Sequence, residues 1–501
     1  MKYKILYALP MCAMLFASCQ DFLQENPRYV ITSDNYYQTK EQIDAAIYGA
    51  YSGLDDIYVG AYGVATSPLF ALDYQPGYAT RPRDAAFAEN QFLFLETLDP
   101  NNEYINNWWK SAYIPIENCN SVIANLNKTK LLEDAAKNRL LGEMHFLRAH
   151  FYFQLVRLFG EVPLKTSPTT NLNEVFFPKS SQDSIYDQIV ADLKFAETSG
   201  LVWEDLPGRA NLGAVKSLLA KVYITMAGYP LQKGTSYYQL AYTKANEVID
   251  SNKYPLFAKY ADLRKVTNEN VKEHIFQIQR ESEKFGNLLH FCYLPYPEKK
   301  ISIQKGVGGA MKPSKAFYDS YAEGDQRIAE KNYYYTSAVQ YGKTTISTFD
   351  PFIYKYWDAD AEVTGKAGAN IWAIRSADIM LLAAEAKAYV DGGTTTDTKA
   401  IDAYYLVRHR AMPNEAKPIS ITLDQVQKER YWELCYEFQT WYDMIRTRRA
   451  FDVVNGTMIN LLDFKAPEHK RAFIEADLLF PIPLEEQQTN PFLAVDTTTA
   501  K

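Results

Sequence analysis

Acidic side chains in two long polar segments are the first candidates for chemistry. Asp73 lies in one segment, and Asp358 and Asp360 lie in another. Glycoside hydrolysis needs one carboxyl group as the acid and a second as the base or nucleophile, at a fixed separation. With 60 acidic residues in the chain, such pairs arise easily, and most Asp and Glu side chains are simply solvated. A surface glycoside hydrolase is therefore a hypothesis that the sequence allows but does not favour.

Other catalytic motifs are incomplete or absent. His145 and His150 are five residues apart, whereas a His-Glu-x-x-His zinc motif places its histidines four apart, on one helical face. The glycine-containing segment 306–311 lacks the last glycine of a dinucleotide-binding loop. The chain carries neither a Gly-x-Ser-x-Gly nucleophile elbow nor a phosphate-binding Walker loop. We therefore predict no catalytic residue, no metal ligand and no cofactor.

Sugar binding suits the composition better. The 38 tyrosines and 7 tryptophans raise the aromatic share to 14%, and aromatic faces stack on sugar rings while planar polar groups bond to their hydroxyls. Two long polar segments, 60–100 and 267–309, exceed the length of ordinary connectors and are therefore expected to be functional. The predicted ligand contacts are Asp73, Tyr74, Tyr78, Arg81, Arg83, Phe87 and Asn90 in the first segment, and Asn287, His290, Tyr293, Tyr296 and Lys299 in the second.

Two questions stay open for these side chains. Arg81 and Arg83 could hold a carboxylate or sulfate bidentately, which would favour an acidic glycan. The alternative for each aromatic residue is that it packs its loop onto the body, because Tyr and Trp are commonly half-buried. Trp108 and Trp109 open a predicted helix, so at least one is expected in the core.

The N-terminus reads as an export signal. Lys2 and Lys4 precede an apolar run that ends at Phe16, and small residues follow before Cys19. The run is too short for a spanning helix and has the order of a secretory signal. A cysteine in this place resembles a bacterial lipoprotein lipobox, so we predict a leader at 1–18 and a mature chain 19–501 that is lipidated on Cys19. Several acyl chains would anchor it stably; the alternative is an ordinary cleaved signal.

The net charge and the cysteine content argue against further classes of protein. Removing the leader leaves 51 basic and 60 acidic residues, a net charge of −9, which argues against non-specific nucleic-acid binding. The mature chain retains Cys119, Cys292 and Cys435 besides Cys19. Three scattered cysteines form neither a disulfide framework nor a zinc site, so we expect small core residues and at most one bridge.

Helices must position the long segments. Apolar residues at steps of three and four predict a helix at 140–159, which Gly160 ends, and a long one at 423–450. Four antiparallel pairs are predicted: 43–54 with 107–126, 140–159 with 184–197, 213–227 with 237–251, and 376–390 with 399–410. The third resembles a tetratricopeptide unit, with alanines at the crossing and Tyr254-Pro255 after it. A third long polar segment spans 332–370. Because no linker divides the chain, a single large body is expected.

Five sequence blocks, taken together, resemble a known family. They are the lipobox continued through 19–27, the helix end at 146–164, the segments 374–386 and 429–446, and Leu479-Phe480-Pro481-Ile482-Pro483 before Asn490-Pro491. Their order and spacing resemble the SusD/RagB family of outer-membrane nutrient-binding lipoproteins over nearly the whole chain.

The resemblance implies a mainly α fold of tetratricopeptide-like helix pairs with long irregular loops, with an N-terminal part at 22–230 and a C-terminal part at 270–501. It also implies a lipid anchor in the outer membrane, facing the cell exterior, and a SusC-like TonB-dependent transporter as partner. The protein would bind a glycan, or a peptide or other nutrient as in some members, and would deliver it without catalysis.

Overall fold

The computed structural model describes residues 36–58, 69, 72–80, 98–171, 175–284, 286–287, 289–295, 301, 309–467 and 469–494. Its α-helices are α2 (Lys40–Tyr58), α5 (Glu103–Lys128), α6 (Asp134–Phe159), α7 (Gln182–Thr198), α8 (Leu212–Ala227), α9 (Thr235–Asp250), α10 (Leu289–Cys292), α11 (Lys315–Asp319), α12 (Ala359–Thr364), α13 (Ser376–Val390), α14 (Thr398–Ala411), α15 (Leu423–Leu434), α16 (Thr440–Thr447) and α17 (Leu484–Thr489). The fold is mainly α, as the sequence predicts.

Local signals in the sequence set the ends of these helices. The Asn102 side chain caps α5 by accepting hydrogen bonds from the backbone N–H groups of Tyr104 and Ile105, which satisfies donors that lack partners inside the helix. Helix α6 ends at Gly160, whose φ of 69° suits glycine. Helix α15 begins with a capping box between Thr422 and Gln425.

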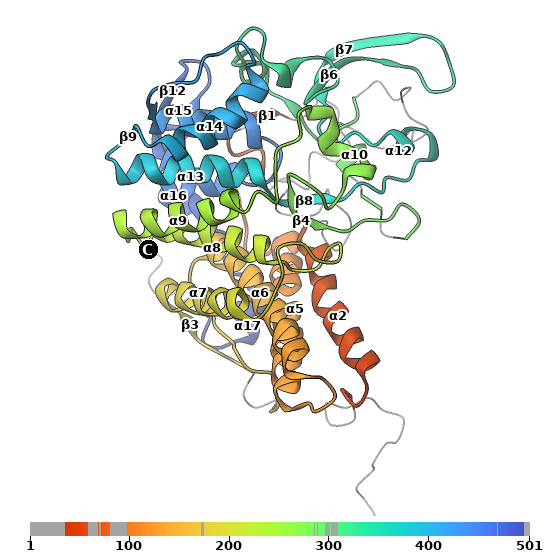
Figure 1. The fold of residues 1–501 in the computed structure, drawn as a ribbon, viewed down its shortest axis with the longest axis vertical. Helices are drawn as coiled ribbons and strands as arrows, with labels where there is room; N and C mark the ends of the chain where they lie inside the picture. The colour runs from red at the N-terminus through yellow and green to blue at the C-terminus, as the bar shows by residue number, and fades with distance from the viewer. Residues whose placement is uncertain are drawn as a thin grey trace, which may run out of the picture.

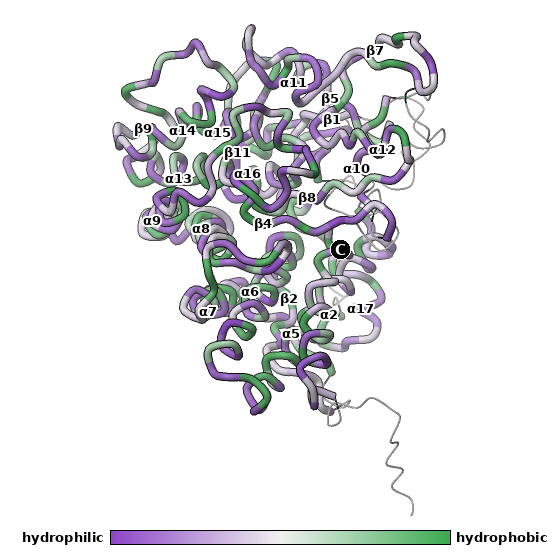
Figure 2. The backbone as a smooth tube through the Cα atoms, turned by 45° about the vertical axis from the view of Figure 1, so that its right-hand side comes forward, coloured by the Kyte–Doolittle hydropathy of each residue, from purple (hydrophilic) through white to green (hydrophobic). Residues whose placement is uncertain are grey.

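All four predicted helix pairs form. Helix α2 packs on α5, α6 on α7, α8 on α9, and α13 on α14, and neighbouring pairs also contact one another. Figure 1 shows the helices following one another along the long axis, from α5, α6 and α7 in the lower half to α13 and α14 above. Hydrophobic and hydrophilic stretches alternate along them (Figure 2), as expected for helices that each bury one face.

Among the described residues, the strands form six short antiparallel pairs. They are β1 (Ala79–Thr80) with β5 (Lys312–Pro313), β2 (Val162–Pro163) with β3 (Lys179–Ser180), β4 (His274–Ile278) with β8 (Ile371–Arg375), β6 (Tyr334–Val339) with β7 (Ile346–Ile353), β9 (Thr394–Thr395) with β10 (Ile421–Thr422), and β11 (Arg449–Asp452) with β12 (Thr457–Asn460). These pairs connect, through backbone hydrogen bonds, segments that lie between the helices.

One hydrophobic cluster extends from Ile43 to Leu493 and so joins both halves of the chain. A second lies between α13 and α14, and a third lies beneath the hairpin β6–β7. Trp108 and Trp109 both belong to the first cluster, which confirms that at least one is core. Cys119, Cys292 and Cys435 are buried and unpaired.

The structure corrects two predicted segments. The helix predicted at 423–450 is two helices, because Tyr436 and Phe438 adopt left-handed φ values of 63° and 60° and turn the chain between α15 and α16. The third long segment, 332–370, is not irregular throughout, since it contains the hairpin β6–β7 and helix α12. Both differences arise from tertiary packing that a periodic pattern does not record.

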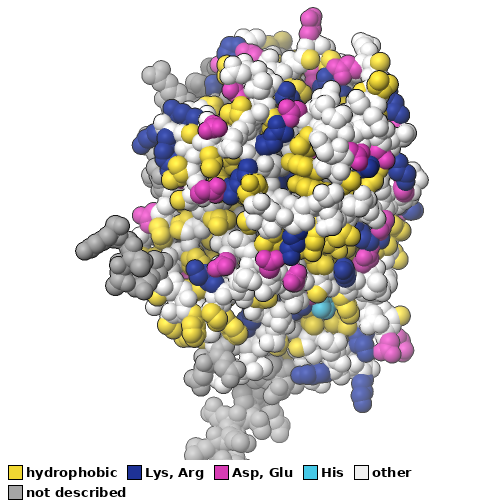
Figure 3. All heavy atoms as spheres, turned by 90° about the vertical axis from the view of Figure 1, so that its left-hand side faces the viewer, with side chains coloured by type: hydrophobic (Ala, Val, Ile, Leu, Met, Phe, Trp, Pro, Cys, Tyr) yellow, Lys and Arg dark blue, Asp and Glu magenta, His cyan; other side chains and the backbone are white. Residues whose placement is uncertain are grey.

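Charge is distributed evenly over the face shown in Figure 3. Basic and acidic side chains are interspersed there with hydrophobic ones, without a broad basic area. In the described part of the chain, no helix combines the length and the apolar character needed to cross a membrane.

Candidate functional site

The three long segments meet on one side of the molecule. Strand β1 of the first pairs with β5, which directly follows the second, and the Ser314 N–H donates to the Tyr78 carbonyl at 2.9 Å. The second meets the third through Asn287, whose side-chain amide donates to the Ala369 carbonyl at 2.7 Å. Figure 1 places α10, α12 and the hairpin β6–β7 together beside the helices. We call this region the loop face.

The predicted contacts of the first segment that the structure describes, Asp73, Tyr74 and Tyr78, are buried. The Tyr78 hydroxyl donates to the Asp73 carboxylate, and the Tyr74 hydroxyl donates to the Ala310 carbonyl. The Tyr78 ring packs edge-on against Tyr436, with ring centroids 4.9 Å apart. Burial raises the pKa of Asp73 to about 8, although the hydrogen bond from Tyr78 opposes the rise. These side chains join the first segment to the core.

The described contacts of the second segment are buried as well. His290 accepts a hydrogen bond from the Asp358 N–H at 3.1 Å, and burial lowers its pKa to about 4, so the ring is neutral at pH 7. The Tyr293 ring stacks on Tyr356 with centroids 5.5 Å apart. Asn287, His290 and Tyr293 are at most 3% exposed.

This burial matches the alternative in which the aromatic residues pack their loops. Asp73, Tyr74 and Tyr78 are at most 1% exposed, so a sugar ring could stack on either tyrosine only if the loop opened. A surface on which a sugar ring can stack directly must therefore be formed by neighbouring residues. Cys19, Arg81, Arg83, Phe87, Asn90, Tyr296 and Lys299 lie outside the described residues. Their roles stay predictions.

An aromatic cluster in the third segment supplies a surface that the sequence analysis missed. It comprises Tyr335, Phe349, Tyr354 and Trp357, with the Trp357 ring stacked on Tyr354 at 4.9 Å and 14°. Trp357 and Phe349 are half-buried, so each keeps part of its ring accessible. The sequence carried two signals, the length of the segment and its aromatic content, since nine of its 39 residues are aromatic against 14% for the whole chain.

Polar groups surround this cluster. The Arg264 guanidinium lies 4.6 Å from the Tyr354 ring centroid and donates to the Lys331 carbonyl at 2.7 Å. Among the described residues, the Trp357 indole N–H has no hydrogen-bond acceptor, whereas its backbone N–H donates to the Tyr354 carbonyl. A half-buried indole with a free donor, stacked on a tyrosine ring that also contacts a guanidinium, is a suitable platform for a hydroxyl-rich ring.

The candidate catalytic carboxylates have structural partners. Asp358 caps α12: one oxygen accepts from the Asp360 and Ala361 N–H groups at 3.0 and 3.2 Å, and the other accepts from Gly368 and Ala369 at 2.9 and 3.2 Å. Asp360 is exposed. No cluster of three potential metal-ligating side chains occurs in the described part of the chain.

The acidic residues of the late helices form buried ion pairs. Asp443 pairs with Arg430 and Arg446 at 2.7 and 2.8 Å. Glu433 and Glu437 both pair with Arg375, at 2.8 and 2.7 Å. Arg375 belongs to β8, which is distant in the sequence.

Two family models match the chain. Residues 21–224 match a model described as "Starch-binding associating with outer membrane", and residues 310–494 match the model of the SusD family. A protein from Formosa agariphila, SusD-like protein P25, is 24% identical over 96% of each chain.

Solved structures share the fold. The crystal structure of a SusD superfamily protein from Parabacteroides distasonis has 33% sequence identity and a TM-score of 0.82, covering 92% of this chain and 98% of that one. Surface glycan-binding protein A from Bacteroides thetaiotaomicron, in complex with laminarihexaose, has 22% identity and a TM-score of 0.72, covering 91% and 99%.

Proposed function

The chain belongs to the SusD family, and from this premise we propose that it is a surface lipoprotein that captures a glycan and passes it to a SusC-like TonB-dependent transporter. Cys19 carries the lipid anchor once the leader 1–18 has been removed, so the mature chain 19–501 starts at the outer membrane. The polar stretch that follows Cys19 tethers the helical body at the cell exterior. One family model is itself described by association with the outer membrane.

The aromatic cluster of the loop face carries the glycan-binding part of the proposal. The Trp357 ring, stacked on Tyr354, offers an apolar face, and its indole N–H together with Arg264 offers donors for hydroxyls. The predicted residues Arg81, Arg83, Phe87, Asn90 and Tyr296 belong to the same two segments that meet here and would add contacts. The laminarihexaose complex of a protein with the same fold supports this ligand class.

The surroundings of two candidate carboxylates, Asp73 and Asp358, support binding without catalysis. Both oxygens of Asp358 accept backbone hydrogen bonds, and Asp73 is buried against Tyr78. Neither arrangement leaves an acid and a base facing a common space, as glycoside hydrolysis requires. The protein therefore acts as a capture module.

A polysaccharide panel tests the proposal. The purified mature protein should migrate more slowly in native gels that contain its glycan than in plain gels, and it should release no reducing ends from that glycan over hours. Release of reducing ends that is lost in Asp73→Asn would instead show an enzyme. No retardation with any glycan, together with retardation by peptide, would replace the glycan with a peptide ligand.

A further inference from the structure

A small cavity lies away from the loop face, where the N-terminal helices meet the C-terminal segment. Its volume is about 90 Å³. Side chains from α6, α7, α8 and α16 line it, together with the 3-10 helix Glu475–Leu478. One water needs about 10–15 Å³ of such space, so the cavity has room for several waters or one small oxyanion.

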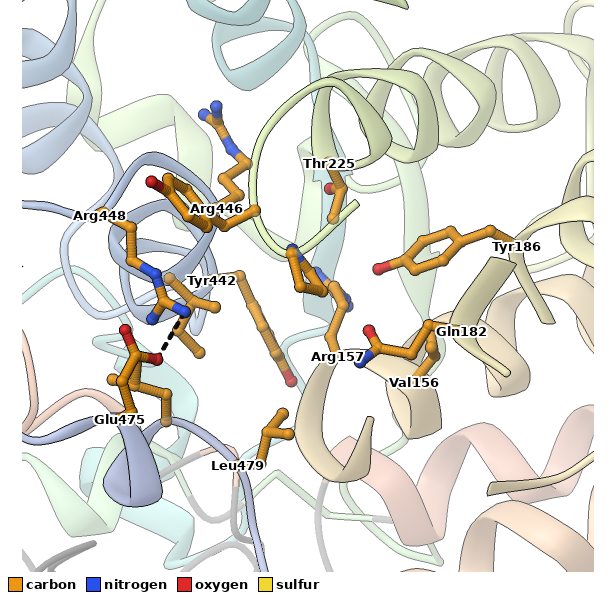
Figure 4. A pocket seen from close by; sticks show the side chains of 14 residues that line it. Val156, Arg157, Gln182, Tyr186, Thr225, Tyr442, Arg446, Arg448, Glu475 and Leu479 are labelled. Atoms are coloured by element: carbon orange, nitrogen blue, oxygen red, sulfur yellow. Dashed lines mark hydrogen bonds and ion pairs between the residues drawn. The ribbon is translucent and has the colours of Figure 1, made fainter. Parts of the chain in front are cut away.

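Arg157 is the key residue of this cavity. Its side chain is nine-tenths buried and lies among the lining residues near the Tyr186 hydroxyl (Figure 4). Its Nε donates to the Phe153 carbonyl at 3.0 Å, and one terminal nitrogen donates to the Gln154 side-chain oxygen at 2.8 Å. No carboxylate among the described residues forms an ion pair with it.

Aromatic contacts compensate only part of this buried charge. The guanidinium carbon lies 3.9 Å from the Phe153 ring centroid and 3.6 Å from the Tyr442 centroid. Cation–π contacts stabilise a buried cation, but less than the loss of hydration destabilises a charged group on burial. An anion next to Arg157 would remove much of the difference.

The other charged side chains of the lining are paired. Arg446 is neutralised by Glu385 at 2.6 Å and Asp443 at 2.8 Å, and Arg448 by Glu475 at 2.8 Å. Glu475 is the one acidic residue among the described side chains that line the cavity. Arg157 therefore supplies the positive charge that has no counterpart.

Tyr186 adds a suitable donor. Its side chain is 1% exposed, its hydroxyl points toward Arg157 in Figure 4, and it forms no hydrogen bond with any described residue. The hydroxyl is therefore free to donate, and an oxyanion could accept from it and from the guanidinium together. Gln182 lines the same cavity.

We propose that this cavity binds one small oxyanion, held by Arg157 and Tyr186, and that the anion stabilises the contact between the N-terminal helices and the C-terminal segment. Free sulfate or phosphate and the acidic group of a uronic acid share the required chemistry.

Binding is tested by titrating the purified mature protein with sulfate, phosphate or glucuronate, using chloride at equal ionic strength and neutral glucose as controls. The melting temperature should rise and saturate with at least one oxyanion, and calorimetry should give one site per chain. A response to glucuronate alone would identify a sugar acid as the source, and a response to sulfate or phosphate would identify the free ion. Equal responses to chloride, or no saturable response, would overturn the proposal.

Two variants locate the site. Arg157→Gln should raise the Kd at least tenfold, and Tyr186→Phe, which removes only the hydroxyl, should raise it several-fold while keeping the helical circular-dichroism spectrum. If Arg157→Gln does not fold, the Kd of Tyr186→Phe for the oxyanion tests the site by itself. An unchanged Kd in the folded variants would place the anion elsewhere and refute this assignment.

Discussion

Buried charged side chains form ion pairs with one another in the core beneath the loop face, and Glu433 contacts several of them. One of its oxygens accepts from Arg375 at 2.8 Å and from Arg410 at 2.7 Å, and the Tyr333 hydroxyl donates to the same oxygen at 3.0 Å. The arginines hold the pKa of Glu433 well below its ordinary value in spite of burial. The network links β8, α14 and α15.

Removing this carboxylate should be costly. Glu433→Ala leaves Glu273 as the carboxylate that Arg375 and Arg410 still share, and breaking a buried ion pair costs about 3–5 kcal/mol. Asp402 provides the control, because its ion pair with Lys417 is about half exposed and Asp402→Ala should cost less than about 1 kcal/mol. Urea unfolding of both variants measures the difference, and equal midpoints would contradict the account.

Asp73 should make stability depend on pH. Its pKa is about 8 in the folded protein and about 3.9 in the unfolded chain, so the folded state binds the proton more tightly. Stability should therefore fall as the pH rises from about 4 to 8, by at most about 1.4 kcal/mol per pH unit. Asp73→Asn, which stays neutral, should lose less stability between pH 5 and pH 8. Parallel melting-temperature curves for the two proteins would refute this.

At the scale of elements, the sequence predicts the long helices well and their interruption poorly. The helix at 140–159 and its stop at Gly160 follow from periodicity and one glycine. The break between α15 and α16 does not, because Tyr436 and Phe438 are buried apolar residues that keep the helical pattern while adopting left-handed φ values. Only their packing against distant segments, such as Tyr436 on Tyr78, explains that conformation.

The close crossing of α2 and α5 depends on one glycine. A Cβ atom at Gly53 would lie 2.4 Å from the Pro115 Cβ and 3.3 Å from the Phe151 ring, so Gly53→Ala should destabilise the protein by about 1–3 kcal/mol through overpacking. Gly49, one turn earlier in α2, has nothing within 4 Å of a Cβ. Gly49→Ala should be neutral or stabilising by up to about 1 kcal/mol. Thermal unfolding of the two variants should shift in opposite directions or by clearly different amounts.

At the scale of the whole molecule, the sequence predicts where the long segments between helices lie but not which of their side chains reach solvent. Tyr74 is hidden because its hydroxyl meets Ala310, 236 positions away in the chain. Trp357 is accessible because it lies at the edge of a cluster that the hairpin β6–β7 builds. Both outcomes depend on long-range contacts, which a single sequence without a structure does not reveal.

The anchor can be tested on intact cells. Cys19→Ser removes the sulfur that would carry the lipid, so the variant should leave the membrane fraction and lose surface labelling, since membrane attachment depends on buried acyl chains. A second change, Cys119→Ser, serves as the control because Cys119 is buried in the core and should leave localisation unchanged. Membrane retention of Cys19→Ser would contradict the lipid anchor.

The most direct test of glycan capture by the loop face is calorimetric titration of three proteins with the glycan found in the panel. Trp357→Ala should weaken binding about tenfold or more, which corresponds to about 1.4 kcal/mol, and Trp357→Phe should retain part of the affinity. Tyr48→Ala removes an aromatic ring that is 59% exposed on α2, remote from the loop face, and should bind like the wild type. Wild-type affinity in folded Trp357→Ala would contradict the account.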